Sequence, residues 1–188
     1  MQEIRLIDIL RKHDLGSRVG LREEGQRVKA DIEAAIRAMK EKDVLLIDFT
    51  GVEVLSHSFA DEIIALPLSR LVAREHGEKY LVIRIDKDEL CEDLEGALRK
   101  RDLALLRLRG SGRRTWTVLG ALSDELRETL KVIGDEGPIA TGSLAERMGL
   151  KLQACSNRVV ELGKQHLIRR SRVEGERGVK NENALAIA

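Results

Sequence analysis

Residues with chemically useful side chains lie together near the middle of the first half of the chain. Ser56, His57 and Ser58 follow the apolar run "VLLIDF" and open a predicted helix. Hydroxyl groups at the positive end of a helix can cap its free N–H groups or accept a phosphate. The pattern favours capping, with Ser58 accepting the N–H of Asp61 and Asp61 returning a bond to the N–H of Ser58. His57 has no orienting partner in the sequence, which argues against a general base.

Residue sets that would indicate an enzyme or a metal centre are missing from the sequence. The nearest carboxylate pair, Asp61 and Glu62, consists of adjacent residues that point in different directions on a helix. Cys91 and Cys155 have no His or Cys at ligand spacing, so we expect two free thiols in a reducing compartment. We therefore expect no enzymatic activity and no cofactor.

Apolar patterns alternate between helical and strand periods over about the first 120 residues. This alternation predicts a sheet with helices packed on it. Residues 4–10 fit both periods and favour a strand, while residues 16–25, rich in glycine, are left as a loop that could bind a ligand or a partner. The other expected helices are at 26–40, 56–77 (kinked at Pro67) and 86–101, and the other expected strands are at 44–49, 79–85, 103–108 and 115–122.

The pattern changes near residues 120–123, where we place a boundary between domains 1–122 and 123–188. A helix over 123–134 begins the second domain. Thr141 or Ser143 is expected to cap a short helix that ends at Gly149, and a second helix follows over 152–162. The stretches "HLIRRSRV" and "NALAIA" predict a hairpin joined by "EGERG".

Charge is distributed unevenly along the chain. Up to Pro138 there are 24 Lys and Arg against 27 Asp and Glu, and after it 9 against 5. The tail is therefore the basic part, which favours a polyanionic partner if the bases gather on one element. The longest apolar stretches are short and 35% of residues are charged, so we expect a cytoplasmic protein with no membrane span and no secretory leader.

The string "VLLIDFTGVEVLSHSFADEI" resembles the central strand, turn and helix of STAS domains. It is closest to a STAS-like prokaryotic family with a D-F-x-G-V stretch followed by S-F-A-D-E. The resemblance spans about residues 18–90 and implies an α/β domain with a mixed sheet and packed helices. In partner-switching members, a D-S-S-G stretch carries the phosphoserine. Its four positions fall here on Ser56, His57, Ser58 and Phe59, so the usual acceptor is replaced.

Residues 123–188 resemble a winged helix-turn-helix domain of bacterial transcription regulators, an α+β fold. The resemblance implies that the second helix enters the major groove of double-stranded DNA and that the wing meets backbone or minor groove. Gln and Asn suit adenine, Arg suits guanine and Lys meets phosphate. The residues implied to contact DNA are Lys151, Gln153, Ser156, Asn157 and Arg158 on the helix and Arg170, Arg172, Arg177 and Lys180 in the wing.

Two functional interpretations follow from these features. In the first, the protein is a homodimeric DNA-binding transcription regulator whose STAS-like domain dimerises, senses a signal or docks a partner. In the second, it is a partner-switching protein whose STAS-like domain binds a kinase-type ATPase through Ser56, His57 and Ser58. In that case the winged helix serves only protein contacts or dimer packing.

Overall fold

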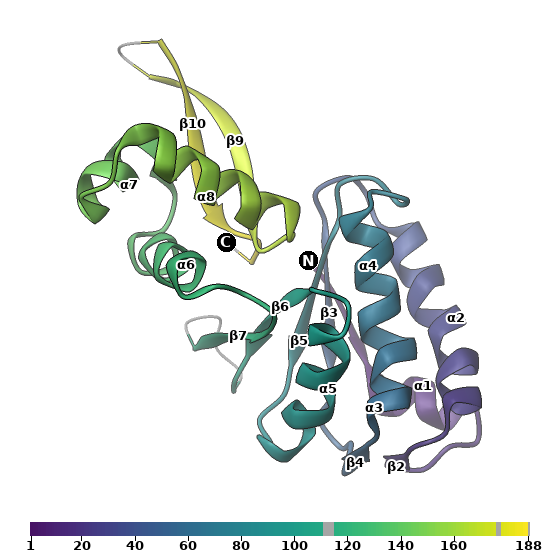
Figure 1. Ribbon diagram of the computed structural model, residues 1–188. Helices are drawn as coiled ribbons and strands as arrows, with labels where there is room; N and C mark the ends of the chain where they lie inside the picture. The colour runs from purple at the N-terminus through teal and green to yellow at the C-terminus, as the bar shows by residue number, and fades with distance from the viewer. Residues whose placement is uncertain (111–114, 176–177, 188) are drawn as a thin grey trace. The chain divides into compact units, whose positions relative to one another are not determined.

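The computed structural model describes residues 1–110, 115–175 and 178–187. Its internal contacts divide the chain into two compact units, Met1–Ala121 and Leu122–Ala188 (Figure 1). Residues 111–114, in the expected turn between the last two strands of the first unit, lie outside the described part, as does Arg177.

The first unit is built on a mixed five-stranded sheet with the strand order β1-β3-β5-β6-β7. Neighbouring strands from β1 to β6 run parallel, and β7 is antiparallel to β6. The expected strands at 44–49, 79–85, 103–108 and 115–122 are confirmed. The strands are β1 (Gln2–Arg5), β3 (Val44–Asp48), β5 (Tyr80–Arg84), β6 (Ala104–Leu108) and β7 (Trp116–Gly120).

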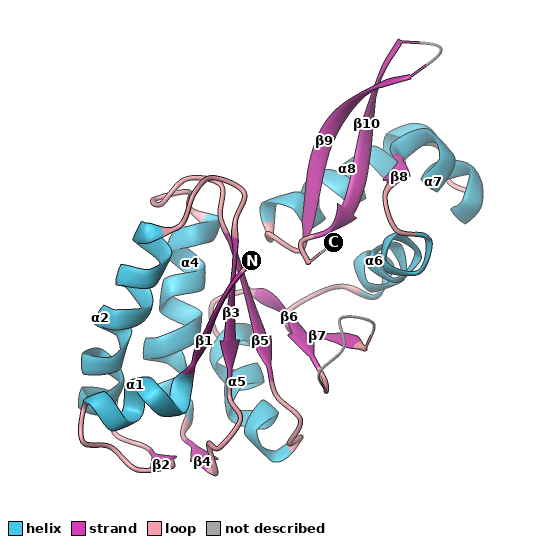
Figure 2. Cartoon of the chain, turned by 180° about the vertical axis from the view of Figure 1, so that it is seen from behind, coloured by secondary structure: helices cyan, strands magenta, loops and turns pink. Residues whose placement is uncertain are grey.

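Helices of the first unit pack on one face of this sheet (Figure 2). They are α1 (Leu6–Lys12), α2 (Arg22–Ala38), α3 (His57–Ala60), η1 (Asp61–Ala65), α4 (Leu66–Val72) and α5 (Glu89–Arg99). α2 buries Val28, Ile32 and Ile36 at helical spacing, and they join Leu45 and Ile47 of β3 in one apolar core. The core therefore forms where the periodicity of α2 and the apolar run of β3 meet.

Two details of the first unit differ from the sequence-based expectation. The strand expected at 4–10 is wrong for most of its length, because β1 ends at Arg5 and α1 buries Leu6, Ile7 and Leu10 at helical spacing. The single helix expected as far as Gly77, with a kink at Pro67, is divided into α3, η1 and α4 and ends at Val72. The π-helical η1 lies directly before α4, which holds Pro67 at its start, and the wider turn accommodates a residue that has no N–H to donate.

The second unit combines three helices with a three-stranded antiparallel sheet of order β8-β10-β9. Its elements are α6 (Asp124–Glu136), β8 (Ile139–Ala140), α7 (Thr141–Met148), α8 (Leu152–Lys164), β9 (Ile168–Gly175) and β10 (Gly178–Leu185). Gly149 ends α7 in the left-handed conformation, at φ 65°, as expected. The expected caps by Thr141 or Ser143 are wrong. Ala140 is the N-cap residue, and the Thr141 hydroxyl accepts a bond from Asn183 Nδ2 at 3.0 Å.

Candidate functional site

The serine corner, which we define as Ser56, His57 and Ser58, forms the start of α3. Ser56 Oγ accepts the Phe59 N–H at 3.2 Å and donates to Gly20 O at 2.6 Å. Ser58 Oγ lies 3.1 Å from both Gly20 O and Ser56 Oγ. The expected cap by Ser58 is therefore wrong, because Ser56 has the extended backbone of an N-cap residue and Ser58 already lies inside the helix.

The segment 16–25, which we expected to be a loop that could bind a ligand or a partner, holds the serine corner in place. β2 (Arg18–Val19) pairs in parallel with β4 (Val54–Leu55), and the Ser56 N–H donates to Val19 O at 3.1 Å. The next carbonyl, that of Gly20, faces both serine hydroxyls. This contact between distant segments fixes Ser56 at the helix start. The sequence near Ser56 contains no sign of it, because the contacting residues lie about 36 positions earlier in the chain.

His57 packs against α5. A Cβ atom on Gly96 would lie 3.0 Å from His57 Nδ1, so the imidazole occupies the space that this glycine leaves free. Within the described part of the chain, no group of three His, Cys, Asp or Glu side chains could hold a metal ion. The side chain of His57 thus has a packing role in the helix layer.

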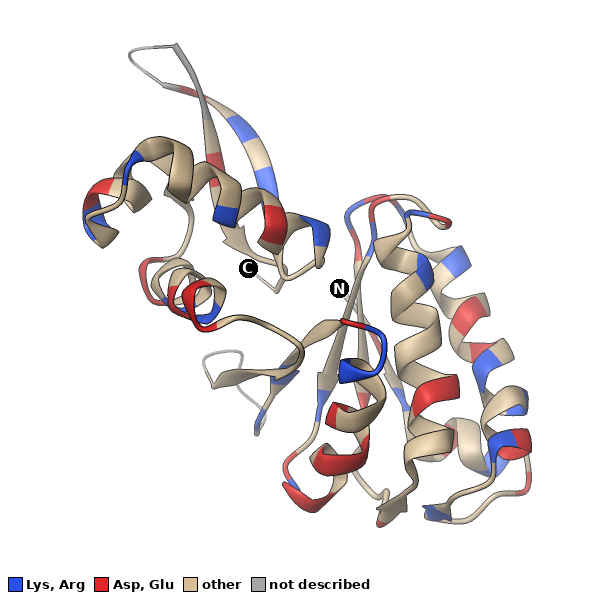
Figure 3. Cartoon of the chain, in the orientation of Figure 1, with Lys and Arg blue, Asp and Glu red and all other residues tan. Residues whose placement is uncertain are grey.

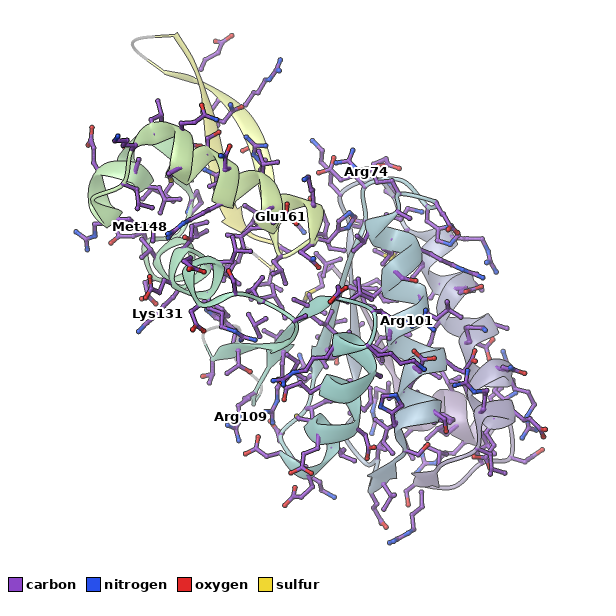
Figure 4. The ribbon with its side chains drawn as sticks, viewed as in Figure 1. Arg74, Arg101, Arg109, Lys131, Met148 and Glu161 are labelled. Atoms are coloured by element: carbon purple, nitrogen blue, oxygen red, sulfur yellow. The ribbon has the colours of Figure 1, made fainter. Side chains whose placement is uncertain are left out.

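Asp61 and Glu62 belong to a buried ion-pair cluster instead of a capping box. Arg101 lies just after α5 (Figure 4), and its Nε and Nη2 donate to the two carboxylate oxygens of Asp61 at 2.6 and 3.0 Å. Glu62 accepts bonds from Lys29 at 2.6 Å and Arg22 at 2.7 Å. The expected return bond from Asp61 to Ser58 is therefore wrong, since the carboxylate is turned toward an arginine 40 residues away.

The electrostatics of this cluster keep both carboxylates ionised. The hydrogen bond from Arg101 lowers the pKa of Asp61 against the opposing effect of burial. Burial acts to raise the pKa of Glu62, but Lys29 and Arg22 outweigh it and the pKa is lowered. Gly25 allows α2 to approach here, because a Cβ atom on it would lie 2.9 Å from Glu62 Cβ.

On α8 of the second unit, the structure separates the predicted DNA-contacting residues into two groups. Lys151, Gln153 and Asn157 are exposed and Ser156 is half-buried. Gln153 Nε2 donates to Asn157 Oδ1 at 3.1 Å, which joins the two amides on one face. The expected outward direction of Arg158 is wrong. Its guanidinium donates to α6, at 3.3 Å to Glu125 O and 3.4 Å to Thr129 Oγ1.

Strand β9 exposes two of the predicted arginines on the same side. Arg170 and Arg172 alternate along the strand, so their side chains leave the same face of the hairpin. A Cβ atom on Gly163 of α8 would lie 3.4 Å from Arg170 Cδ, so this glycine lets the arginine stem pass close to the helix. Lys180 lies in β10 opposite Val173.

In the second unit, acidic residues gather on helix α6 and basic residues on strand β9. α6 carries five acids, Asp124, Glu125, Glu128, Asp135 and Glu136, against two bases, Arg127 and Lys131, whereas Arg169, Arg170 and Arg172 follow one another closely in β9 (Figure 3). The basic excess after Pro138 is thus offset by α6, and charge is segregated within the unit.

Comparison with protein families identifies part of the first unit. Residues 24–85, about a third of the chain, match the model of a STAS-like domain of unknown function (DUF4325). The match runs from α2 through the serine corner to the end of β5, so a STAS-like domain is present around the geometry described above. No curated protein and no solved structure matches the chain significantly. No helix in the described residues is both long and apolar enough to cross a membrane.

Proposed function

We propose that the protein is a DNA-binding transcription regulator in which residues 123–188 form a winged helix-turn-helix domain. The observation that carries this proposal is the exposed amide pair Gln153–Asn157 on α8, in the same small unit as the exposed Arg170 and Arg172 of β9. Amides on a helix can read base edges in the major groove, and arginines on a hairpin can bind phosphates.

The order of elements in the second unit supports this proposal. The elements follow in the order helix α6, short strand β8, helices α7 and α8 joined by a tight turn, and the hairpin of β9 and β10. The short β8 pairs with the last strand, β10. This arrangement leaves one face of α8 exposed while Cys155, Val159 and Leu162 hold the other against the core. A helix supported from one side in this way suits insertion into a groove.

The STAS-like domain is the part of the regulator for which we propose dimerisation, sensing or partner docking. A homodimer would present two copies of α8 to a two-fold symmetric operator, which is the usual solution for helix-turn-helix regulators. The proposal requires no enzymatic activity and no cofactor, and it places the protein in the cytoplasm with its DNA.

A second candidate function is partner switching, favoured by apolar side chains around the serine corner. Leu21 is 64% exposed beside Gly20, and Val54 is 41% exposed in β4. Exposed apolar residues on both sides of two hydroxyl groups suit a protein contact, here with a kinase-type ATPase. Phosphorylation of Ser56 or Ser58 would replace the donor that binds Gly20 O, and phosphopeptide mapping from native cells that found the serine corner unmodified would exclude the switch.

The test of the regulator proposal is a titration of full-length protein against duplex fragments from its own upstream region, from about 50 to about 200 mM salt. We expect saturable binding that weakens with salt. Arg172→Gln should weaken binding to all fragments alike and reduce the salt slope by about one. Arg27→Gln, on an exposed position of α2, is the matched control and should change neither quantity. Absence of saturable binding at the lowest salt would overturn the proposal.

A further inference from the structure

The exposed side chains of α8 between Leu152 and Val160 are amide or apolar, and Leu152 is 60% exposed. Gln153, Ala154, Asn157 and Val160 are exposed, with Val160 at 37%. Their spacing of three and four residues places Gln153, Asn157 and Val160 in one row, with Ala154 on its flank. The first half of α8 is drawn without charge colour in Figure 3, and the charged positions begin at Arg158.

The cations on and beside α8 are bound to other groups or lie at the ends of the helix. Arg158 is bound to Glu125 O and Thr129 Oγ1 of α6. Lys164 is the last residue of α8 and pairs with Glu161 at 3.1 Å. It lies about 10 Å along the helix axis from Asn157, at 1.5 Å per residue. Lys151 precedes the helix as its N-cap residue, where a phosphate contact suits it better.

The amide pair can read adenine without giving up its internal hydrogen bond. Gln153 Nε2 uses one N–H on Asn157 Oδ1, which leaves its second N–H and its carbonyl oxygen for a base. Asn157 keeps both N–H groups and one lone pair of Oδ1. Each amide can therefore accept from adenine N6 and donate to adenine N7 while the two remain bonded to each other.

We propose that α8 selects A·T base pairs, with Gln153 and Asn157 bound to adenine and Ala154 and Val160 in contact with thymine methyl groups. The inference rests on the proposed DNA-binding function and names the base composition of its target. Apolar side chains beside an amide match the methyl group that thymine presents in the major groove. The row contains no arginine, the side chain that most often pairs with guanine O6 and N7.

The experiment is a selection of duplexes with a randomised centre by full-length protein, followed by titration of the selected duplex. We expect enrichment of A·T pairs in the centre. Asn157→Ala should reduce the preference for the selected duplex over a G·C-substituted one on the order of tenfold or more. Asn157→Asp should move the preference toward cytosine, whose N4 group donates to a carboxylate. Gln26→Ala, on an exposed position of α2, is the matched amide control and should leave the preference unchanged.

Replacement of thymine by uracil in the selected duplex tests the apolar contacts separately, because only the methyl group is removed. If uracil weakens binding by the wild-type protein, and Val160→Ser binds the thymine and uracil duplexes equally, the assignment of Val160 is supported. Equal binding to both duplexes overturns the methyl contacts. Enrichment of G·C pairs, or binding without base preference, overturns the inference while leaving DNA binding intact. If the protein shows salt-dependent binding to none of the duplexes, both the inference and the proposed DNA-binding function are overturned.

Discussion

Removal of Arg101 should strongly destabilise the first unit, because it leaves the buried carboxylate of Asp61 without its main partner. Asp61 is 2% exposed and receives two hydrogen bonds from Arg101. Loss of one member of a buried pair costs about 3–5 kcal/mol. Arg22 Nη1 remains 3.7 Å from Asp61 Oδ2, but it is half exposed and partly screened by solvent. We therefore expect Arg101→Gln to lower the free energy of unfolding by about 3 kcal/mol at neutral pH.

The effect of Arg101→Gln should depend on pH in a defined direction. The folded-state pKa of Asp61 is lowered, so the ion pair stabilises the fold above the pKa of about 3.9 of an unfolded aspartate. This contribution is lost as the pH falls through the lower folded-state pKa. The difference in stability between wild type and Arg101→Gln should therefore be largest near pH 7 and narrow as the pH falls below about 4.

The assay is urea unfolding of the full-length protein followed by tryptophan fluorescence. Trp116 is the single tryptophan and lies in β7, so the signal reports on the first unit. Arg99→Gln is the matched control, because Arg99 forms an exposed pair with Glu95 on the same helix and should cost about 0.5 kcal/mol or less. Equal costs for the two variants, or a cost for Arg101→Gln that is independent of pH, would refute the assignment of Asp61 as a buried ion-pair partner.

Two further predictions concern the packing around the serine corner. Gly25→Ala should destabilise the first unit by about 1–3 kcal/mol, because the new methyl group would lie 2.9 Å from Glu62 Cβ. Ser56→Ala should cost about 1–2 kcal/mol because it removes the helix cap and the bond to Gly20, whereas Ser58→Ala should cost less. The same unfolding assay checks both, and a larger cost for Ser58→Ala would contradict the assignment of Ser56 as the cap.

Periodicity was sufficient to predict strands β3, β5, β6 and β7, the long helices and the position of the second unit's helices, because each depends on residues close together in sequence. The identity of the helix cap was not predictable in this way. Ser56 and Ser58 both have suitable hydroxyls, and the choice between them is made by the pairing of β2 with β4, more than 30 residues apart in sequence. The partner of Asp61 is likewise set by the fold, since Arg101 meets it only after α5 has packed against η1.

In the second unit, the direction of the Arg158 side chain was likewise not predictable from periodicity. Its position on a helical wheel lies on the flank of the exposed row, where a side chain can turn either way. The acceptors that decide its direction, Glu125 O and Thr129 Oγ1, belong to α6 and lie about 30 residues earlier. A residue expected to read guanine thus becomes a link between two helices.

We expect the segregation of charge to favour sequence selectivity in the proposed DNA interface. An unsegregated basic surface would attract any duplex through its phosphates, independent of sequence. In the second unit, the acids of α6 oppose such general attraction, while Arg170 and Arg172 supply a local positive surface on β9. Few phosphate contacts imply a shallow salt dependence, so we expect a larger share of the affinity to come from the proposed base-reading row on α8. Substitutions at Gln153 and Asn157 should therefore change sequence preference more than they change the salt slope.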